Sequence, residues 1–225
     1  MDYSAISKAY DFSRIKGEED FKFDPGRFRD LIKKFSLDSL IAEKNGVQRP
    51  EFSGNMDGVV NVSMNQQAVT RATDAKPVLA TFGLGPCVAL VGYEPSVNVG
   101  FLTHYSASTE VAQSFPELLA TLYRIGLSHE APTRFDVRLV GGYDNLDKLI
   151  EELKTRVRYG TSFKMEIVEE DTGYVADGRS VALDTRTGEL FSYNPQKNPN
   201  TKIPNKLEQM QMLIPRPADL VYEPR

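Results

Sequence analysis

Residues 78–93, which read VLATFGLGPCVALVGY, decide the fold of this chain. The stretch consists of an apolar run at 78–82, a glycine-containing turn at 83–86 and a second apolar run at 87–93. Short apolar runs between turns are typical of strands buried on both faces. A further turn at 94–96 leads into another apolar segment at 97–105. The pattern therefore predicts successive strands that lie side by side, with the last two antiparallel.

The chain after this stretch alternates irregularly between helical and strand patterns. We expect a helix from Ser114, with Pro116 in its first turn, to Gly126, and a second helix capped by Asp144 or Asn145. Strands are expected at 59–62, 135–140, 163–168, 180–183 and 189–193, whereas 63–77 reads as irregular. Strands outnumber helices and do not alternate with them one for one, which favours the α+β class.

The two ends of the chain differ from this middle part. We expect an N-terminal helical extension and linker over 1–57, a central domain over 58–193 and a C-terminal tail over 194–225 that packs on the domain. The extension carries apolar side chains at helical spacing after Pro25, so it either packs on the domain or binds a partner. In the tail, a docking patch is expected at Met210, Met212, Leu213 and Ile214.

Composition narrows the function classes. The 225 residues carry a net charge of −4, with a pI near 5.4, so the basic excess of nucleic-acid and membrane-surface proteins is absent. No apolar run approaches the length of a membrane span, and the N-terminus does not read as a signal peptide. The single cysteine excludes an intrachain disulfide and favours the cytoplasm, although export without a signal peptide stays open. With two histidines, we expect no metal site built from several His or Cys ligands.

Cys87 is the candidate nucleophile of a hydrolase. It follows a turn in which Gly83 and Gly85 can present backbone N–H groups to an oxyanion. Antiparallel pairing of the next two strands would bring the start of one, with Cys87, to the end of the other, with His104. A thiolate–imidazolium pair would lower the pKa of the thiol, and the Thr81 hydroxyl could orient the imidazole.

Other polar residues carry weaker signals. Tyr105 and Ser106 at the same strand end are candidates for a substrate pocket or an oxyanion site. The pair Gly141-Gly142 is expected to allow a close approach of strand and helix. His129 reads as a surface or capping residue near a helix C-terminus. The turn at 83–88 begins like a dinucleotide fingerprint but lacks its third glycine, which argues against a nucleotide site.

The segment TFGLGPCV at 81–88, together with His104, resembles the signature T-x-G-L-G-S-C-V of the chemoreceptor glutamine deamidases, the CheD family. The double glycine at 141–142, the segment EDTG at 170–173 and the hairpin at 178–188 also resemble motifs of this family, in the same order. The resemblance covers residues 58–193. It implies a sandwich of mixed β-sheets flanked by helices, and no metal or organic cofactor.

The resemblance also implies an activity. Cys87 would be the nucleophile, His104 the general base and acid, and Thr81 the residue that holds His104. The implied reaction is hydrolysis of a protein glutamine side-chain amide to glutamate, with release of ammonia. The implied partners are a protein substrate, such as a chemoreceptor, and a signalling protein that regulates the enzyme.

The chain departs from the family pattern at several positions. Pro86 stands where the family has serine and removes one backbone N–H. Tyr105-Ser106 replaces the apolar pair that follows the family's histidine, and Tyr174 replaces a glycine. Two alternatives stay open: a non-catalytic module that docks a signalling protein, and a transglutaminase or amidase of the same fold.

Overall fold

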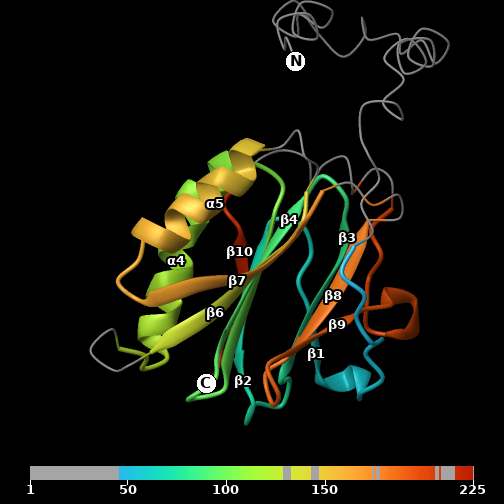
Figure 1. Cartoon of the computed structure of the whole chain (residues 1–225). Coiled ribbons are helices and arrows are strands. Elements are labelled where there is room, and N and C mark those ends of the chain that lie inside the picture. Colours follow the sequence, from blue (N-terminus) through green and yellow to red (C-terminus); the bar gives the residue numbers. More distant parts are fainter. Residues whose placement is uncertain are drawn as a thin grey trace, which may run out of the picture. The chain divides into compact units, whose positions relative to one another are not determined.

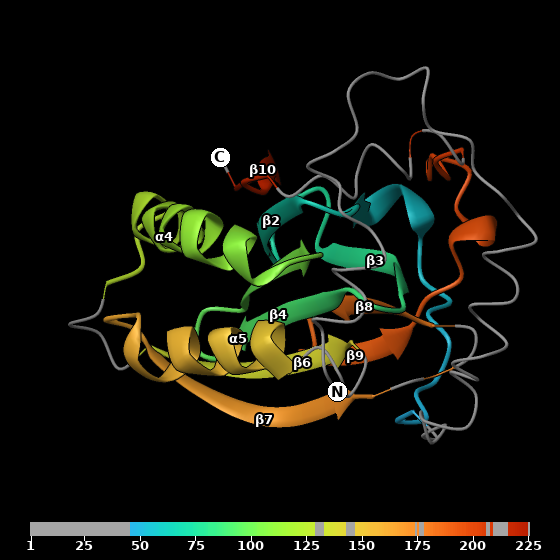
Figure 2. The same cartoon turned by 90° about the horizontal axis from the view of Figure 1, so that it is seen from above.

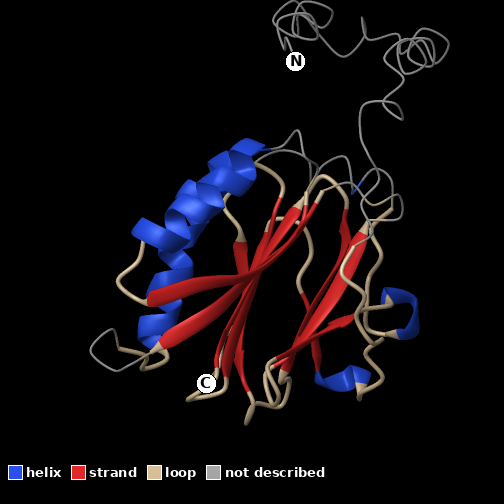
Figure 3. Cartoon of the chain, viewed as in Figure 1, coloured by secondary structure: helices blue, strands red, loops and turns tan. Residues whose placement is uncertain are grey.

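The protein is described here from a computed structural model. The structure describes residues 46–128, 133–142, 147–173, 175, 178–205, 208 and 216–224. Two β-sheets pack face to face, and two helices cover the outer face of the larger sheet (Figure 1). Figure 3 shows the same arrangement by element type, with the two long helices on one side of the strands and short helical turns beside the smaller sheet. The expected α+β sandwich of mixed sheets flanked by helices is confirmed.

The larger sheet has six strands in the order β10-β2-β5-β4-β6-β7. Its central strands pair antiparallel, whereas β10 with β2 and β6 with β7 pair parallel. Every residue of β4 and β5 is buried, as expected for apolar strands covered on both faces. The strands are β2 (Gln66–Arg71), β4 (Val88–Glu94), β5 (Val99–Tyr105), β6 (Arg134–Gly141), β7 (Lys164–Thr172) and β10 (Asp219–Tyr222).

The smaller sheet has four strands in the order β1-β3-β8-β9. In it β1 and β3 are parallel, and the other two pairs are antiparallel. Figure 2, which views the molecule from above, shows the two sheets as neighbouring layers. The strands are β1 (Val59–Asn61), β3 (Val78–Leu84), β8 (Arg179–Asp184) and β9 (Glu189–Ser192), and two short 3-10 helices are η3 (Met56–Gly58) and η5 (Pro195–Lys197).

The helices are α4 (Ser108–Arg124) and α5 (Asp147–Tyr159). The predicted start of α4 at Ser114 is wrong, because the helix begins six residues earlier and Pro116 lies inside it. The apolar face of each helix packs on β4, β5 and β6 in one core cluster, which includes Phe101 and Leu153. A second cluster, with Leu102 and Leu183, fills the space between the two sheets. That second cluster also contains Cys87.

The sequence pattern did not predict two of the strands: β2, in a segment expected to be irregular, and β10, in the tail. The segment expected as a linker at 46–57 is held to the domain at several points. Phe52 is buried, its N–H donates to Ser192 O, and Ser192 N–H donates in turn to Pro50 O. The chain before β1 therefore contributes to the outer face of the smaller sheet, next to Tyr193.

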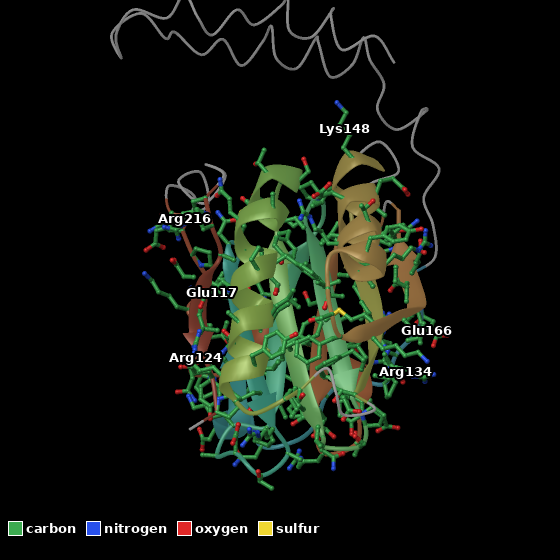
Figure 4. All side chains as sticks on the ribbon, turned by 90° about the vertical axis from the view of Figure 1, so that its left-hand side faces the viewer. Glu117, Arg124, Arg134, Lys148, Glu166 and Arg216 are labelled. Carbon is green, nitrogen blue, oxygen red and sulfur yellow. The ribbon has the colours of Figure 1, made fainter. Side chains whose placement is uncertain are left out.

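The helix-covered side of the molecule carries exposed ion pairs. Arg124 pairs with Glu117, and Arg134 pairs with Glu166 (Figure 4). Within the described part of the chain, no helix is both long and apolar enough to cross a membrane. The predicted N-terminal helix, His129, Tyr174, and the patch at 210–214 lie outside the described residues.

Candidate active site

Cys87 lies between the turn that ends β3 and the first residue of β4. Because β4 pairs antiparallel with β5, Ala89 stands opposite His104. Cys87 packs in the core between the sheets together with Ala89 and Val91, so these alternate residues face the same side. The structure therefore brings the start of β4 next to the end of β5. Cys87, just before β4, faces the smaller sheet.

Thr81 and His104 meet across the two sheets. Thr81 Oγ1 on β3 lies 2.8 Å from His104 Nδ1 on β5, and both side chains are buried. The other ring nitrogen, Nε2, makes no hydrogen bond with any described residue, the Cys87 thiol included. A ring held at Nδ1 has a fixed plane, and its Nε2 is free to exchange a proton.

Burial sets the charge state of the pair. Cys87 is 1% exposed and His104 is 2% exposed. Burial raises the pKa of the Cys87 thiol to about 12, with a smaller contribution from the negative charge of Glu110. Burial also lowers the pKa of the His104 imidazole to about 4. At neutral pH the resting site therefore holds a neutral thiol and a neutral imidazole, because an apolar environment disfavours both charged forms.

The glycine turn presents fewer backbone donors than its sequence suggests. Gly83 has φ +73° and lies exposed, and its N–H is 3.4 Å from Ser180 Oγ. The N–H of Gly85 donates to Gly83 O, and Pro86 has none. The N–H of Cys87 itself donates to no backbone oxygen among the described residues. The Cys87 N–H is therefore the donor of this turn that we consider for the oxyanion of a substrate carbon bonded to Cys87 Sγ.

Glycines from two distant segments pack against this turn. Gly142 N–H donates to Cys87 O at 2.8 Å and lies 3.0 Å from Gly85 O. A Cβ on Gly141 would lie 2.4 Å from Cys87 O, and one on Gly178 would lie 3.4 Å from Gly85 N. Gly142 does pack on a helix, as expected, but Gly141 packs on the nucleophile turn, which the sequence alone did not suggest. The double glycine thus allows the backbone at the end of β6 to contact the backbone of the turn that carries Cys87.

The other two candidate residues lie apart from Cys87. The Tyr105 side chain is fully buried in the core cluster beneath α4, on the face of β5 opposite to His104. The Ser106 hydroxyl donates to Glu110 Oε1 at 2.6 Å. The structure therefore does not bring Tyr105 to the nucleophile, and it places Ser106 in a hydrogen-bond network at the strand end.

A buried ion cluster braces the same end of the sandwich. Asp171 accepts hydrogen bonds from Arg49 at 2.6 Å and from Arg179 at 2.9 Å, and Arg49 also pairs with Glu169. Arg179 donates a further hydrogen bond to Gly173 O at 2.7 Å. The two arginine side chains are 7% exposed and that of Asp171 is 3% exposed. Sequence reasoning singled out the segments around Asp171 and Arg179 but missed Arg49.

Two curated proteins resemble the chain along most of their own length. A probable chemoreceptor glutamine deamidase CheD of Methanosarcina barkeri is 33% identical over 130 residues, which cover 50% of this chain and 83% of that protein. The chain belongs to the CheD family. A probable chemoreceptor glutamine deamidase CheD 1 of Syntrophus aciditrophicus is 28% identical over 134 residues, which cover 51% of this chain and 81% of that protein. No family model matches the sequence.

Membership of the CheD family confirms the resemblance that the motifs at 81–88, 141–142 and 170–188 indicated. The roles of Cys87, His104 and Thr81 stay predictions, which the geometry above makes specific. Within the described residues, no three His, Cys, Asp or Glu side chains come together as metal ligands.

Proposed function

We propose that this CheD-family chain hydrolyses the side-chain amide of a glutamine in a chemoreceptor to glutamate, with release of ammonia. The observation that carries the proposal is the Thr81–His104 hydrogen bond, which fixes a histidine beside β4, the strand that follows Cys87 directly. Both relatives are named as probable chemoreceptor glutamine deamidases. The regulator implied by the resemblance, and the cytoplasm as the compartment, remain expectations of the same proposal.

The chemistry begins with a proton transfer. With Nδ1–H donating to Thr81 Oγ1, the Nε2 lone pair of His104 accepts the thiol proton of Cys87. The sulfur attacks the carboxamide carbon, and the oxyanion that forms accepts a hydrogen bond from the Cys87 N–H. His104 returns the proton to the leaving nitrogen, which departs as ammonia and leaves a thioester.

Hydrolysis of the thioester completes the cycle. His104 accepts a proton from water, the hydroxide attacks the thioester carbon, and the thiol leaves with the proton from His104. The products are a glutamate side chain and the free enzyme. Because the resting thiol is buried and protonated, the first proton transfer requires that substrate binding change the surroundings of Cys87.

The experiment is to incubate the protein with the signalling domains of chemoreceptors encoded in the same genome. Ammonia release and a gain of about one dalton at a glutamine are expected. Cys87→Ala should abolish both, with an unchanged thermal midpoint as evidence that it folds. Ala89→Ser, two residues further along on β4 and in the same core cluster, serves as the control for disturbance of the core. Undiminished ammonia release by Cys87→Ala would refute the proposal.

One observation favours a second function, a non-catalytic docking module. A thiol that is 1% exposed, with a pKa of about 12, is inert in this conformation. The two functions differ in what a bound chemoreceptor domain does to Cys87. An enzyme should show faster reaction of Cys87 with iodoacetamide when the chemoreceptor domain is bound, whereas a docking module should leave Cys87 as unreactive as it is in the resting protein. Incorporation of an added primary amine at the target glutamine would instead indicate a transglutaminase.

A further inference from the structure

Glu110 is a buried carboxylate that the proposed reaction does not use. It stands in the first turn of α4 and is 1% exposed. Its Oε2 accepts the N–H of Ser106 at 2.6 Å and the N–H of Ala107 at 3.1 Å, and its Oε1 accepts the Ser106 hydroxyl at 2.6 Å. An acidic residue in the first helical turn is favoured by the helix dipole, and bonds of this kind cap the helix.

These bonds fix the strand end that carries His104. Ser106 and Ala107 lie just after Tyr105, the last residue of β5. On the other side, Asn65 N–H donates to His104 O at 3.0 Å, and Asn65 Oδ1 lies 3.3 Å from Ser106 Oγ. The backbone at 104–107 is therefore held by β2's preceding loop and by α4, while Thr81 holds the imidazole itself.

The same carboxylate acts electrostatically on the nucleophile. Its negative charge contributes to raising the pKa of Cys87, after burial, and of Tyr105. Among the ionisable groups near the start of β4, His104 on β5 is neutral at rest, and Arg179 on β8 is paired with Asp171 on β7. Removing the charge of Glu110 must lower the pKa of the thiol, because a nearby negative charge disfavours the thiolate.

We propose that Glu110 is a positioning residue of the active site: its buried carboxylate fixes the strand end that carries His104. This inference rests on the proposed deamidase function. A supporting, electrostatic part, the effect of the Glu110 charge on Cys87, concerns the resting protein and does not depend on that function. The roles proposed for Cys87 and His104 do not require a carboxylate in the first turn of α4, so this inference adds Glu110 to the site.

Glu94 provides a matched control. It is also a glutamate that is 1% exposed, and it accepts hydrogen bonds from the Ser96 hydroxyl at 2.8 Å and from the Val97 N–H at 2.8 Å. It sits at the far end of β4, opposite Val99 in the first pair of β5. Seven residues at about 3.3 Å each place it about 23 Å from Cys87. Glu94 therefore clamps the other end of the same strand pair without contributing to the pKa of the thiol.

The first measurement follows the ionisation of Cys87 by NMR. Because the chain has one cysteine, labelling cysteine Cβ with carbon-13 gives a single resonance whose chemical shift reports the thiol and thiolate forms. Glu110→Gln keeps a hydrogen-bond acceptor and removes the charge, so its titration should begin at lower pH than that of the wild type. Glu94→Gln should titrate as the wild type does. A Glu110→Gln titration that coincides with the wild type, or an equal shift in Glu94→Gln, would overturn the electrostatic part.

The second measurement is ammonia release from a chemoreceptor domain. Glu110→Ala removes every bond to the strand end, and we expect kcat to fall about tenfold or more with little change in KM, as when a catalytic group is slightly misplaced. Glu110→Gln should recover part of this loss, whereas Glu94→Ala should cost stability without a comparable loss of kcat. Unchanged kcat in Glu110→Ala would overturn the positioning part. If the wild type itself releases no ammonia, the deamidase proposal fails, and the NMR titration still decides the effect of Glu110 on Cys87.

Discussion

Gly141→Ala should damage the active site more than its size suggests. Gly141 ends β6 with φ +100°, and an added Cβ would lie 2.4 Å from Cys87 O and 2.9 Å from the Leu84 Cβ. Neither neighbour is the free end of a flexible side chain. The alanine can therefore be accommodated only if the backbone of the nucleophile turn moves.

The cost has two parts. An alanine at positive φ costs about 1–2 kcal/mol of backbone strain. Overpacking against a fixed core adds about 1–3 kcal/mol, so the free energy of unfolding should fall by roughly 2–5 kcal/mol. Relief of a 2.4 Å contact requires a shift of about 1 Å, and a displacement of that size at a catalytic group can lower kcat by about a hundredfold.

Gly126→Ala separates strain from contact. Gly126 follows α4 with φ +87°, but no atom lies within 4 Å of the position of its Cβ. It should lose about 1–2 kcal/mol of stability and keep full activity. The assays are urea unfolding and ammonia release from a chemoreceptor domain. If Gly141→Ala behaves like Gly126→Ala in both, the idea that the double glycine braces Cys87 is wrong.

Three further predictions concern the groups around the site. Thr81→Val should leave His104 Nδ1 without its partner, so the free energy of unfolding in urea should fall by about 1–3 kcal/mol and most ammonia release should be lost. Thr81→Ser keeps the hydroxyl and should keep the stability and the ammonia release of the wild type. Because burial lowers the pKa of His104 from 6.5 to about 4, the free energy of unfolding should fall by up to about 3 kcal/mol as the pH drops from 6.5 to 4. His104→Ala should lose this pH dependence. If the dependence persists in His104→Ala, His104 is not its cause. Arg49→Met should lower the free energy of unfolding by about 3 kcal/mol, because it leaves the buried charge of Asp171 less compensated. Arg124→Met removes an exposed ion pair and should lower it by less than about 1 kcal/mol. Equal losses would show that the buried cluster stabilises the fold no more than an exposed pair does.

Local pattern predicted most of the strands but not β2 or β10. The two strands around Cys87 are apolar throughout, so their runs and turns were sufficient signals. In β2, by contrast, Gln67 and Thr70 are fully buried, and polar side chains in the core hide the apolar period. The start of α4 was misplaced because Pro116 is typical of a first turn. The acidic residue at position 110 was the signal for the true start, and it caps the helix there.

The residues of the candidate site also fall into those that local sequence pattern could predict and those that it could not. Cys87, His104 and Thr81 could be predicted because one hairpin and the preceding strand carry all three. Gly141, Gly178 and Glu110 reach the site through packing between segments that are distant in the sequence, and no local spacing encodes such contacts. Tyr105 was a pocket candidate because it follows His104 in the sequence, but this adjacency places its side chain on the opposite face of β5.

The whole arrangement depends on the register of β4 and β5. A slip of one residue would turn His104 away from Thr81 and from the face of Cys87, because side chains alternate along a strand. One contact favours this register: Gly92 stands opposite Phe101, and a Cβ on Gly92 would lie 2.2 Å from the Phe101 ring. In any neighbouring register the ring would meet a side chain instead. Gly92 therefore helps to place the candidate catalytic pair although it lies at the other end of the strand, where sequence reasoning about chemistry would not search.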